Sequence, residues 1–150
     1  MKKLALSLLL FSTLFSINAF SQKQHPTVNH IAFYVYNLQK GTAFYQQIIQ
    51  LDTIPEPFHD GKHTWFKIGD HAQMHLIQGA KAITPHDKNT HICFSVASMD
   101  AFIANLNKAK IPYEDWPGKP YSVTTRVDKV KQIYLQDPDG YWIEINDDKY

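Results

Sequence analysis

Two short segments of the chain repeat the same alternation of polar and apolar positions. Residues 29–35 read NHIAFYV and residues 90–96 read THICFSV. Both segments are rich in β-branched and aromatic residues, which favour β-strands. Side chains two apart on a strand share a face, so one face carries apolar residues and the other carries His30 or His91 at the same place in each copy. The pattern therefore indicates an internal duplication.

The segments that follow each predicted strand also correspond. Apolar residues recur near helical spacing in residues 38–49 and 99–109, with Ser98 as a suitable N-cap and the Ile111–Pro112 pair as a stop. Each half then closes with two strands around a tight turn, at 64–68 and 72–78, and at 132–136 and 141–146. Further short strands are predicted near 52–57 and 113–116. The order strand–helix–strand–strand–strand, occurring twice, predicts an α+β domain of paired βαβββ modules at residues 27–79 and 89–147, linked by 80–88.

The first 21 residues have the layout of a secretory signal peptide. Lys2 and Lys3 precede an apolar run at residues 4–15, and Ala19-Phe20-Ser21 offers small residues at the two positions that a signal peptidase reads. The run is short for a bilayer span, although an uncleaved membrane anchor is the alternative. We expect an exported protein, periplasmic or secreted, whose mature chain starts near Gln22 and makes one domain at residues 22–150, with no membrane contact after cleavage.

Charge and cysteine content narrow the function classes. The whole chain has 15 basic and 14 acidic residues, and removal of Lys2 and Lys3 changes the net charge from +1 to −1. A near-neutral surface gives no reason to expect nucleic acid or an anionic membrane as a partner. Cys93 is the single cysteine, so no internal disulfide can form and stability must come from packing.

Ligand-type side chains recur in the final strand of each half. His75 and Glu144 each stand between two apolar residues, and a lone buried glutamate is costly unless something pairs with it. A pseudo-twofold that superposes His30 on His91 brings His75 and Glu144 to matching positions, so that four ligand-type groups converge. Three imidazoles and a carboxylate suit Zn²⁺, Fe²⁺, Ni²⁺ or Mn²⁺. The other histidines lie in predicted loops or termini, where we expect them to be solvated: His25, His59, His63, His71 and His86.

The stretches NHIAFYV, FYQQIIQL, THICFSV and DPDGYWIEI resemble the vicinal-oxygen-chelate superfamily. This superfamily includes glyoxalase I, extradiol dioxygenases, fosfomycin-resistance enzymes and bleomycin-resistance proteins. The resemblance covers nearly all of the expected mature chain. It implies a cupped mixed β-sheet with flanking helices around one divalent metal ion (Zn, Ni, Fe or Mn), with His30, His75, His91 and Glu144 as ligands. His75 stands where typical glyoxalase I carries a glutamate.

The resemblance also implies a chemistry. A small-molecule substrate would place two adjacent oxygens on the metal, which acts as a Lewis acid. The leading hypothesis is a lyase or isomerase of the glyoxalase type, with Glu144 as the base and His75 as the second candidate. Two alternatives remain open, an iron(II)-dependent dioxygenase and a metal-free ligand-binding module like the bleomycin-resistance proteins. A homodimer is expected by analogy with the family.

Aromatic and basic residues near the predicted metal are candidates to bind the substrate. Tyr34 and Trp65 would line the pocket, and Arg126 could hold a substrate carboxylate with two hydrogen bonds. For the aromatic residues the alternative is ordinary core packing, and for Arg126 it is a solvated loop. Trp116 and Trp142 are further pocket candidates.

Overall fold

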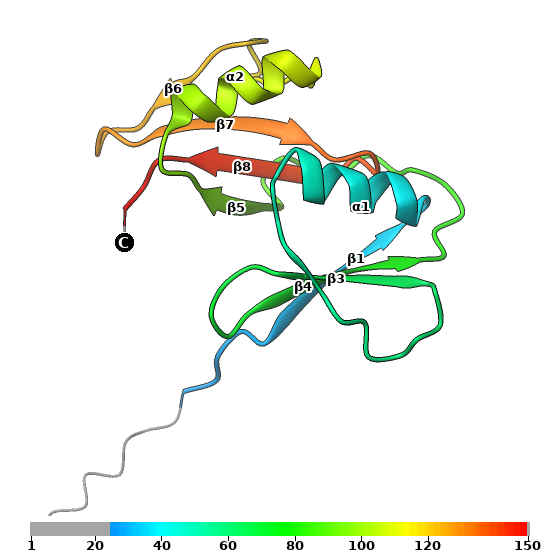
Figure 1. The fold of residues 1–150 in the computed structure, drawn as a ribbon. Helices are drawn as coiled ribbons and strands as arrows, with labels where there is room; N and C mark the ends of the chain where they lie inside the picture. Colours follow the sequence, from blue (N-terminus) through cyan, green and yellow to red (C-terminus); the bar gives the residue numbers. More distant parts are fainter. Residues whose placement is uncertain (1–24, 150) are drawn as a thin grey trace, which may run out of the picture.

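A computed structural model of the protein describes residues 25–149, with each half in the predicted order (Figure 1). The first half contains β1 (His30–Val35), α1 (Leu38–Gln47), β2 (Thr53–Ile54), β3 (His63–Lys67) and β4 (Gln73–Gln78). The second half contains β5 (His91–Ser95), α2 (Met99–Ala109), β6 (Thr124–Thr125), β7 (Lys131–Gln136) and β8 (Trp142–Asn146). The α+β class and the paired βαβββ modules are thus confirmed. The predicted signal peptide at residues 1–21 lies outside the described residues.

The strands form two mixed four-stranded sheets with the same topology. Their orders are β1-β4-β3-β2 and β5-β8-β7-β6, with the first pair parallel and the other pairs antiparallel. The register repeats as well, since Ala32 lies opposite His75 and Cys93 lies opposite Glu144. The duplication seen in the sequence therefore extends to strand register. In each sheet the histidine-bearing strand, β1 or β5, is an edge strand.

The helices begin at side-chain caps. Asn37 accepts a hydrogen bond from the backbone N–H of Lys40, and Ser98 accepts one from Ala101, as the sequence predicted for Ser98. The second helix ends at Ala109, as predicted, and its C-cap Lys110 has a positive φ of 56°, directly before the Ile111–Pro112 pair. The first helix ends at Gln47, two residues earlier than predicted.

The sequence predicted the short edge strands less well. The strand expected near 52–57 is present as the two-residue β2. The strand expected over 113–116 was wrong in extent, because only Glu114 makes isolated bridges, to Pro120 and Tyr134. Proline cannot donate to a β-ladder, and residues 112, 117 and 120 are all proline around this segment. The β6 strand in the same loop was not predicted.

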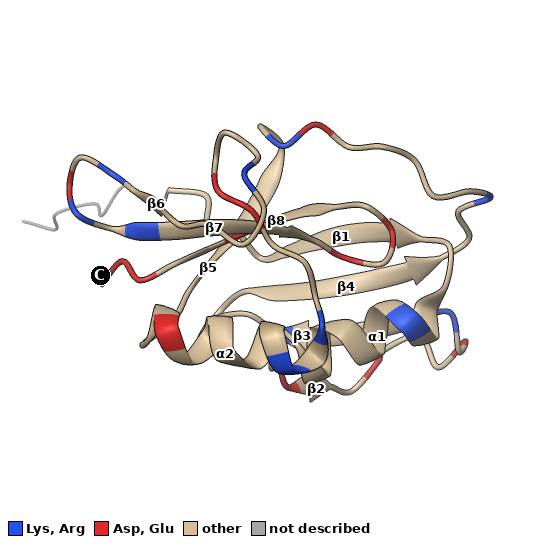
Figure 2. Cartoon of the chain, turned by 90° about the horizontal axis from the view of Figure 1, so that it is seen from above, with Lys and Arg blue, Asp and Glu red and all other residues tan. Residues whose placement is uncertain are grey.

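The apolar faces of both modules contribute to one hydrophobic core. Val35, Phe66 and Leu76 from the first module are fully buried with Ile133 and Ile145 from the second. Figure 1 shows α2 lying over the β5–β8–β7 sheet. Figure 2 shows basic and acidic residues mostly along loops and helices, with both signs spread along the chain. Neither described helix is long and apolar enough to cross a membrane.

The turn between β7 and β8 joins the two modules. The Tyr45 hydroxyl of α1 donates to Asp137 Oδ2 at 3.0 Å, and the backbone N–H of Tyr36 donates to Asp139 Oδ1. Asp137 and Asp139 are both buried. The carboxylate of Asp139 thus lies just before the first turn of α1, which has no acidic residue of its own. The predicted Asp-Pro-Asp-Gly turn is therefore also an inter-module contact.

Candidate metal centre

The first module gathers imidazoles and an indole on one side of its sheet, and we call His30, His63, Trp65 and His75 the module-one half-site. The His30 and His75 rings are 5.2 Å apart between centroids, and Trp65 stacks on His75 at 4.1 Å. His30 donates from Nδ1 to Asn29 Oδ1 at 2.8 Å, which leaves its Nε2 free to act as a ligand. An imidazole held by one nitrogen and open at the other is the usual arrangement of a metal-binding histidine.

His75 is the most deeply placed of these groups. It is 7% exposed, and its Nδ1 is buried without a hydrogen-bond partner among the described residues. Burial lowers the pKa of His75, and the nearby His30 and His63 lower it further. The neutral imidazole that results is the form that ligates metal.

His63 and His86 were expected to be solvated, and both expectations were wrong. His63 is half-buried and stacks 5.9 Å from His75, because β3 begins one residue earlier than predicted and so places residues 63 and 65 on one face. The alternation His63–Trp65 was the available signal. His86 is half-buried and stacks on Tyr141 at 4.0 Å. The remaining three histidines outside the predicted site are exposed, as predicted: His25, His59 and His71.

The second module builds a hydrogen-bonded counterpart, the module-two half-site of His91, Tyr134, Glu144 and Asn146. His91 Nε2 lies 3.2 Å from Glu144 Oε2. The Tyr134 hydroxyl donates to the same oxygen at 2.7 Å, and Asn146 Nδ2 donates to Glu144 Oε1 at 3.1 Å. The pKa of Tyr134 is raised by burial first and then by its hydrogen bond to Glu144, so this hydroxyl stays protonated. The buried carboxylate of Glu144, which the sequence analysis expected to need a partner, therefore has hydrogen-bond donors at both oxygens.

The contact between His91 and Glu144 needs a proton or a metal ion between the two groups. His91 Nδ1 is 2.7 Å from the carbonyl oxygen of Lys88, and a carbonyl only accepts, so Nδ1 carries the proton. In the neutral ring Nε2 then presents a lone pair to Glu144 Oε2, which already accepts from Tyr134. Two lone pairs at 3.2 Å repel each other unless a proton or a metal ion lies between them. The donor set and its geometry thus fit a divalent metal.

Within one chain the structure brings the predicted ligands together only in pairs, His30 with His75 and His91 with Glu144. Across residues 25–149, the only three ligand-type groups with donor atoms all within 4.8 Å of one another are Glu56, Asp60 and His63. Glu56 and Asp60 lie in the loop before β3, and His63 is the first residue of that strand; only Asp60 is exposed. The Asp60 carboxylate there accepts from His63 Nδ1 at 2.9 Å and from the backbone N–H of Lys62 at 2.8 Å. These bonds account for that cluster as a loop turn.

The predicted substrate-binding residues take different places. Trp65 belongs to the module-one half-site, whereas the exposed ring of Tyr34 lies across Gly79. Arg126 is half-buried and pairs with Asp128 at 2.6 Å. Its charge lowers the pKa of Tyr134 as a minor cause, which places it near the module-two half-site. Trp116 is 43% exposed.

Cys93 borders the module-two half-site as a protonated thiol. Its Sγ accepts from Asn146 Nδ2 at 3.1 Å. Burial of the sulfur, followed by the charge of Glu144, raises the pKa of the thiol to about 12, although the residue as a whole is exposed on the edge strand. A thiol in this state is a poor nucleophile.

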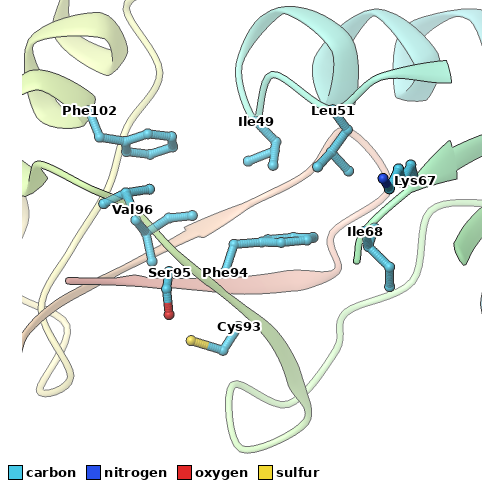
Figure 3. Close-up of a pocket in the computed structure, with 10 residues that line it drawn as sticks. Ile49, Leu51, Lys67, Ile68, Cys93, Phe94, Ser95, Val96 and Phe102 are labelled. Carbon is cyan, nitrogen blue, oxygen red and sulfur yellow. The ribbon is translucent and has the colours of Figure 1, made fainter. Parts of the chain in front are cut away.

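A pocket of about 470 Å³ lies between the modules but does not contain the predicted ligands. Figure 3 shows Phe94, Val96 and Phe102 of the second module across this pocket from Ile49 and Leu51 of the first. Its walls are mainly apolar, and none of the four predicted ligands lines it. The two half-sites therefore lie outside this pocket.

The chain is similar to known proteins over most of its length. The family described as glyoxalase/bleomycin resistance protein/dioxygenase superfamily matches residues 27–145. Metallothiol transferase FosB of Shouchella clausii is 30% identical over 123 residues, which cover 79% of this chain and 78% of the relative. Two solved structures share the fold. Fosfomycin resistance protein FosX of Listeria monocytogenes has a TM-score of 0.65 at 21% identity, covering 82% of this chain and 93% of that one. Lactoylglutathione lyase of Agrobacterium tumefaciens has a TM-score of 0.61 at 18% identity, covering 83% and 95%.

Proposed function

This chain belongs to the glyoxalase/bleomycin resistance protein/dioxygenase superfamily, and from that premise we propose that it is a metal-dependent enzyme acting on a small molecule with two adjacent oxygens. The proposed reaction is a lyase or isomerase step of the glyoxalase type. The observation that carries the proposal is that His91 Nε2 lies 3.2 Å from Glu144 Oε2 while Nδ1 faces the Lys88 carbonyl, an arrangement that a metal ion or a proton between the two groups satisfies. The buried, unpartnered Nδ1 of His75 supports it.

In this proposal His30, His75, His91 and Glu144 hold one divalent ion. The metal supplies Lewis acidity toward the two substrate oxygens. Glu144 is the proposed base, because its carboxylate is the only acidic group in the two half-sites. His75 is the second candidate, since its lowered pKa keeps it neutral and able to accept a proton. Trp65 would form an apolar wall against the substrate.

The proposal includes a homodimer that completes the metal site. His30 and His75 belong to one sheet of the chain, and His91 and Glu144 to the other. Each sheet ends on an edge strand, β1 or β5, that has a single neighbour among the described strands. Exposed edges are available for pairing with another chain. A second copy that places its β1 beside β5 would bring a module-one half-site to a module-two half-site twice in a twofold dimer.

Metal analysis tests the site. Untagged wild-type protein is expected to hold close to one divalent ion per chain by elemental analysis. His91→Ala and Glu144→Ala should lose it, whereas the double variant Glu56→Ala with Asp60→Ala, in the loop before β3, should retain it as the matched control. If folded wild-type protein binds ligands without metal, the proposal is wrong and the chain is a metal-free ligand-binding module. Metal-dependent oxygen uptake on iron loading with a catechol would replace it with the dioxygenase.

A hybrid dimer tests whether the site lies between copies. A His30→Ala chain has a defective module one, and a His91→Ala chain has a defective module two. Refolded together, they should form hybrid dimers in which one site is fully intact and the other has both lesions, so hybrids bind metal although neither parent does. If the site lies within one chain, each hybrid site carries one lesion and no metal binding returns.

A thiol-transfer reaction is the second candidate function, favoured by the 30% identity to a metallothiol transferase. The two reactions are separable with metal-loaded protein. An isomerase would exchange the proton next to the carbonyl of an α-hydroxyketone with D₂O, followed by NMR. A transferase would consume a low-molecular-weight thiol only when fosfomycin is present. Loss of either activity in Glu144→Gln ties it to the site.

We also propose export, as the amino-terminal sequence predicts. Cleavage after Ser21 would give a chain beginning at Gln22. Intact-mass measurement on protein recovered from the periplasm or medium of an expressing bacterium tests this. A mass that includes residues 1–21, found in the cytosol, would contradict it.

A further inference from the structure

The segment that links the modules ends directly behind His91. Asp87 closes a turn there, accepting from the backbone N–H of Asn89 at 2.8 Å, and Lys88 presents its carbonyl oxygen to His91 Nδ1 at 2.7 Å. Because a carbonyl oxygen only accepts, this contact favours a proton on Nδ1 of the neutral His91 ring. The carbonyl competes with Glu144 Oε2, which lies 3.2 Å from Nε2 and would accept a proton from that nitrogen instead.

The side chain of Lys88 holds this carbonyl in place. Its ammonium pairs with Glu114, and it lies 3.3 Å from the carbonyl oxygen of Trp116. The side chains of Lys88 and Glu114 are only 18% and 28% exposed, so the pair is well shielded from solvent. The linker is thus tied to the segment around residues 114–116, which bridges to β7 through Tyr134.

The same ammonium lies among three aromatic rings. Its Nζ is 4.8 Å from the ring centroid of Trp142, 5.6 Å from that of Tyr134 and 6.0 Å from that of Trp116. Attraction between a cation and aromatic faces at these distances fixes the lysine further. Tyr134 is also the residue whose hydroxyl donates to Glu144. Lys88 therefore reaches both proposed ligands of this half-site, His91 through its carbonyl and Glu144 through the ring of Tyr134.

We propose that Lys88 is a positioning residue, which fixes the Nδ1-protonated tautomer of His91 and thereby directs Nε2 toward the metal. The expected effect on metal affinity rests on the proposed metal site, whereas the effect on the His91 tautomer concerns the metal-free chain alone. When the clamp is removed, the His91 proton should move in part to Nε2, where it bonds Glu144 and blocks the ligand position. Groups that orient metal ligands in this way typically contribute about 10- to 100-fold in metal affinity.

Lys88→Met tests the clamp, because it keeps the aliphatic stem and removes the charge. Lys88→Arg keeps the charge and should restore wild-type behaviour in part, and Lys81→Met, an exposed lysine in the same linker, is the matched control. The first readout is the ring ¹⁵N NMR spectrum of His91 in metal-free protein, at a pH where the imidazole is neutral. We expect a single Nδ1–H tautomer in wild type and Lys81→Met, and a mixture in Lys88→Met.

The second readout is the metal dissociation constant from competition with a chelator, which should rise about 10- to 100-fold in Lys88→Met and remain unchanged in Lys81→Met. If Lys88→Met does not fold, Glu114→Gln removes the ion pair while the ammonium stays among its rings, and a smaller shift in the same direction is expected. An unchanged tautomer in folded Lys88→Met overturns the inference. Wild-type protein that binds no metal at His91 overturns the proposed function instead, and the tautomer measurement still decides the role of Lys88.

Discussion

The hydrogen bond between Tyr45 and Asp137 offers a quantitative test of the inter-module contact. Tyr45 is fully buried and Asp137 is 5% exposed. Asp137 Oδ1 accepts from the backbone N–H groups of Asp139 and Tyr141, each at 2.9 Å, whereas Oδ2 accepts only from the Tyr45 hydroxyl at 3.0 Å. Tyr45→Phe therefore leaves one oxygen of a buried carboxylate without a donor while the ring still fills its place in the core.

The expected cost is that of a buried hydrogen bond to a charged group, about 2 kcal/mol. For a domain of this size that free energy corresponds to a fall in Tm of roughly 6–10 °C. The assay is urea unfolding and thermal melting of the purified protein at pH 7. Tyr113→Phe is the matched control, because Tyr113 is also buried but its hydroxyl makes no side-chain hydrogen bond within residues 25–149. The control should be close to wild type in stability.

The pH dependence of this effect has a defined direction. Burial raises the pKa of Asp137, although the backbone donors and the Tyr45 hydroxyl partly oppose it. The ionised carboxylate therefore reduces folding stability at neutral pH, and this cost disappears as the pH falls through the folded pKa of Asp137. Removal of the hydroxyl enlarges the cost, so the difference between variant and wild type should be greatest at pH 7 and shrink on acidification. A difference below about 0.5 kcal/mol, or one independent of pH, would refute this account of the contact.

Three further substitutions test the candidate site. Tyr134→Phe removes a donor to Glu144 Oε2 and should weaken metal binding by about 10- to 100-fold in chelator competition, so a dissociation constant equal to wild type would contradict that role. Cys93→Ser should retain metal. In the wild-type protein the pKa of the Cys93 thiol is raised to about 12, so the thiol should react with iodoacetamide at pH 8 more than about 100-fold slower than free cysteine. Alkylation at the rate of free cysteine would show that the thiol is exposed and reactive. Arg126→Met should raise KM by about tenfold for a substrate with a carboxylate and leave kcat unchanged, and equal KM values would mean that Arg126 serves only its pairing with Asp128.

The sequence predicted what depends on local pattern and missed what depends on neighbours. The alternation in NHIAFYV and THICFSV is sufficient to define β1 and β5, and Ser98 defines the start of α2. The two-residue β6 has no pattern of its own and exists because it pairs with β7. His63 was expected in a loop because the strand was predicted to begin at residue 64. The strand begins one residue earlier, so His63 is part of it and shares a face with Trp65.

Long-range contacts explain why only part of the candidate site was predictable. The duplication identified four ligand-type positions, because equivalent positions in the two repeats can be matched in the sequence without knowing how the two modules pack. The groups that support them lie elsewhere in the chain: Tyr134 is ten residues from Glu144, and the ion pair of Lys88 with Glu114 spans 26 residues. No periodicity marks these partners, because each depends on how the 113–116 segment and the linker pack against β7 and β8.

The two half-sites occupy equivalent positions but are supported by different forces. Both oxygens of Glu144 accept hydrogen bonds, from Tyr134 and Asn146, which orient the carboxylate. His75, at the corresponding strand position, is held by stacking against Trp65 and has a buried nitrogen without a partner. Stacking fixes a ring plane without favouring either protonation state as hydrogen bonds do. Duplication of the fold thus gives two equivalent strand positions. The surrounding residues place a hydrogen-bonded carboxylate at one and a stacked imidazole, whose pKa is lowered by burial, at the other.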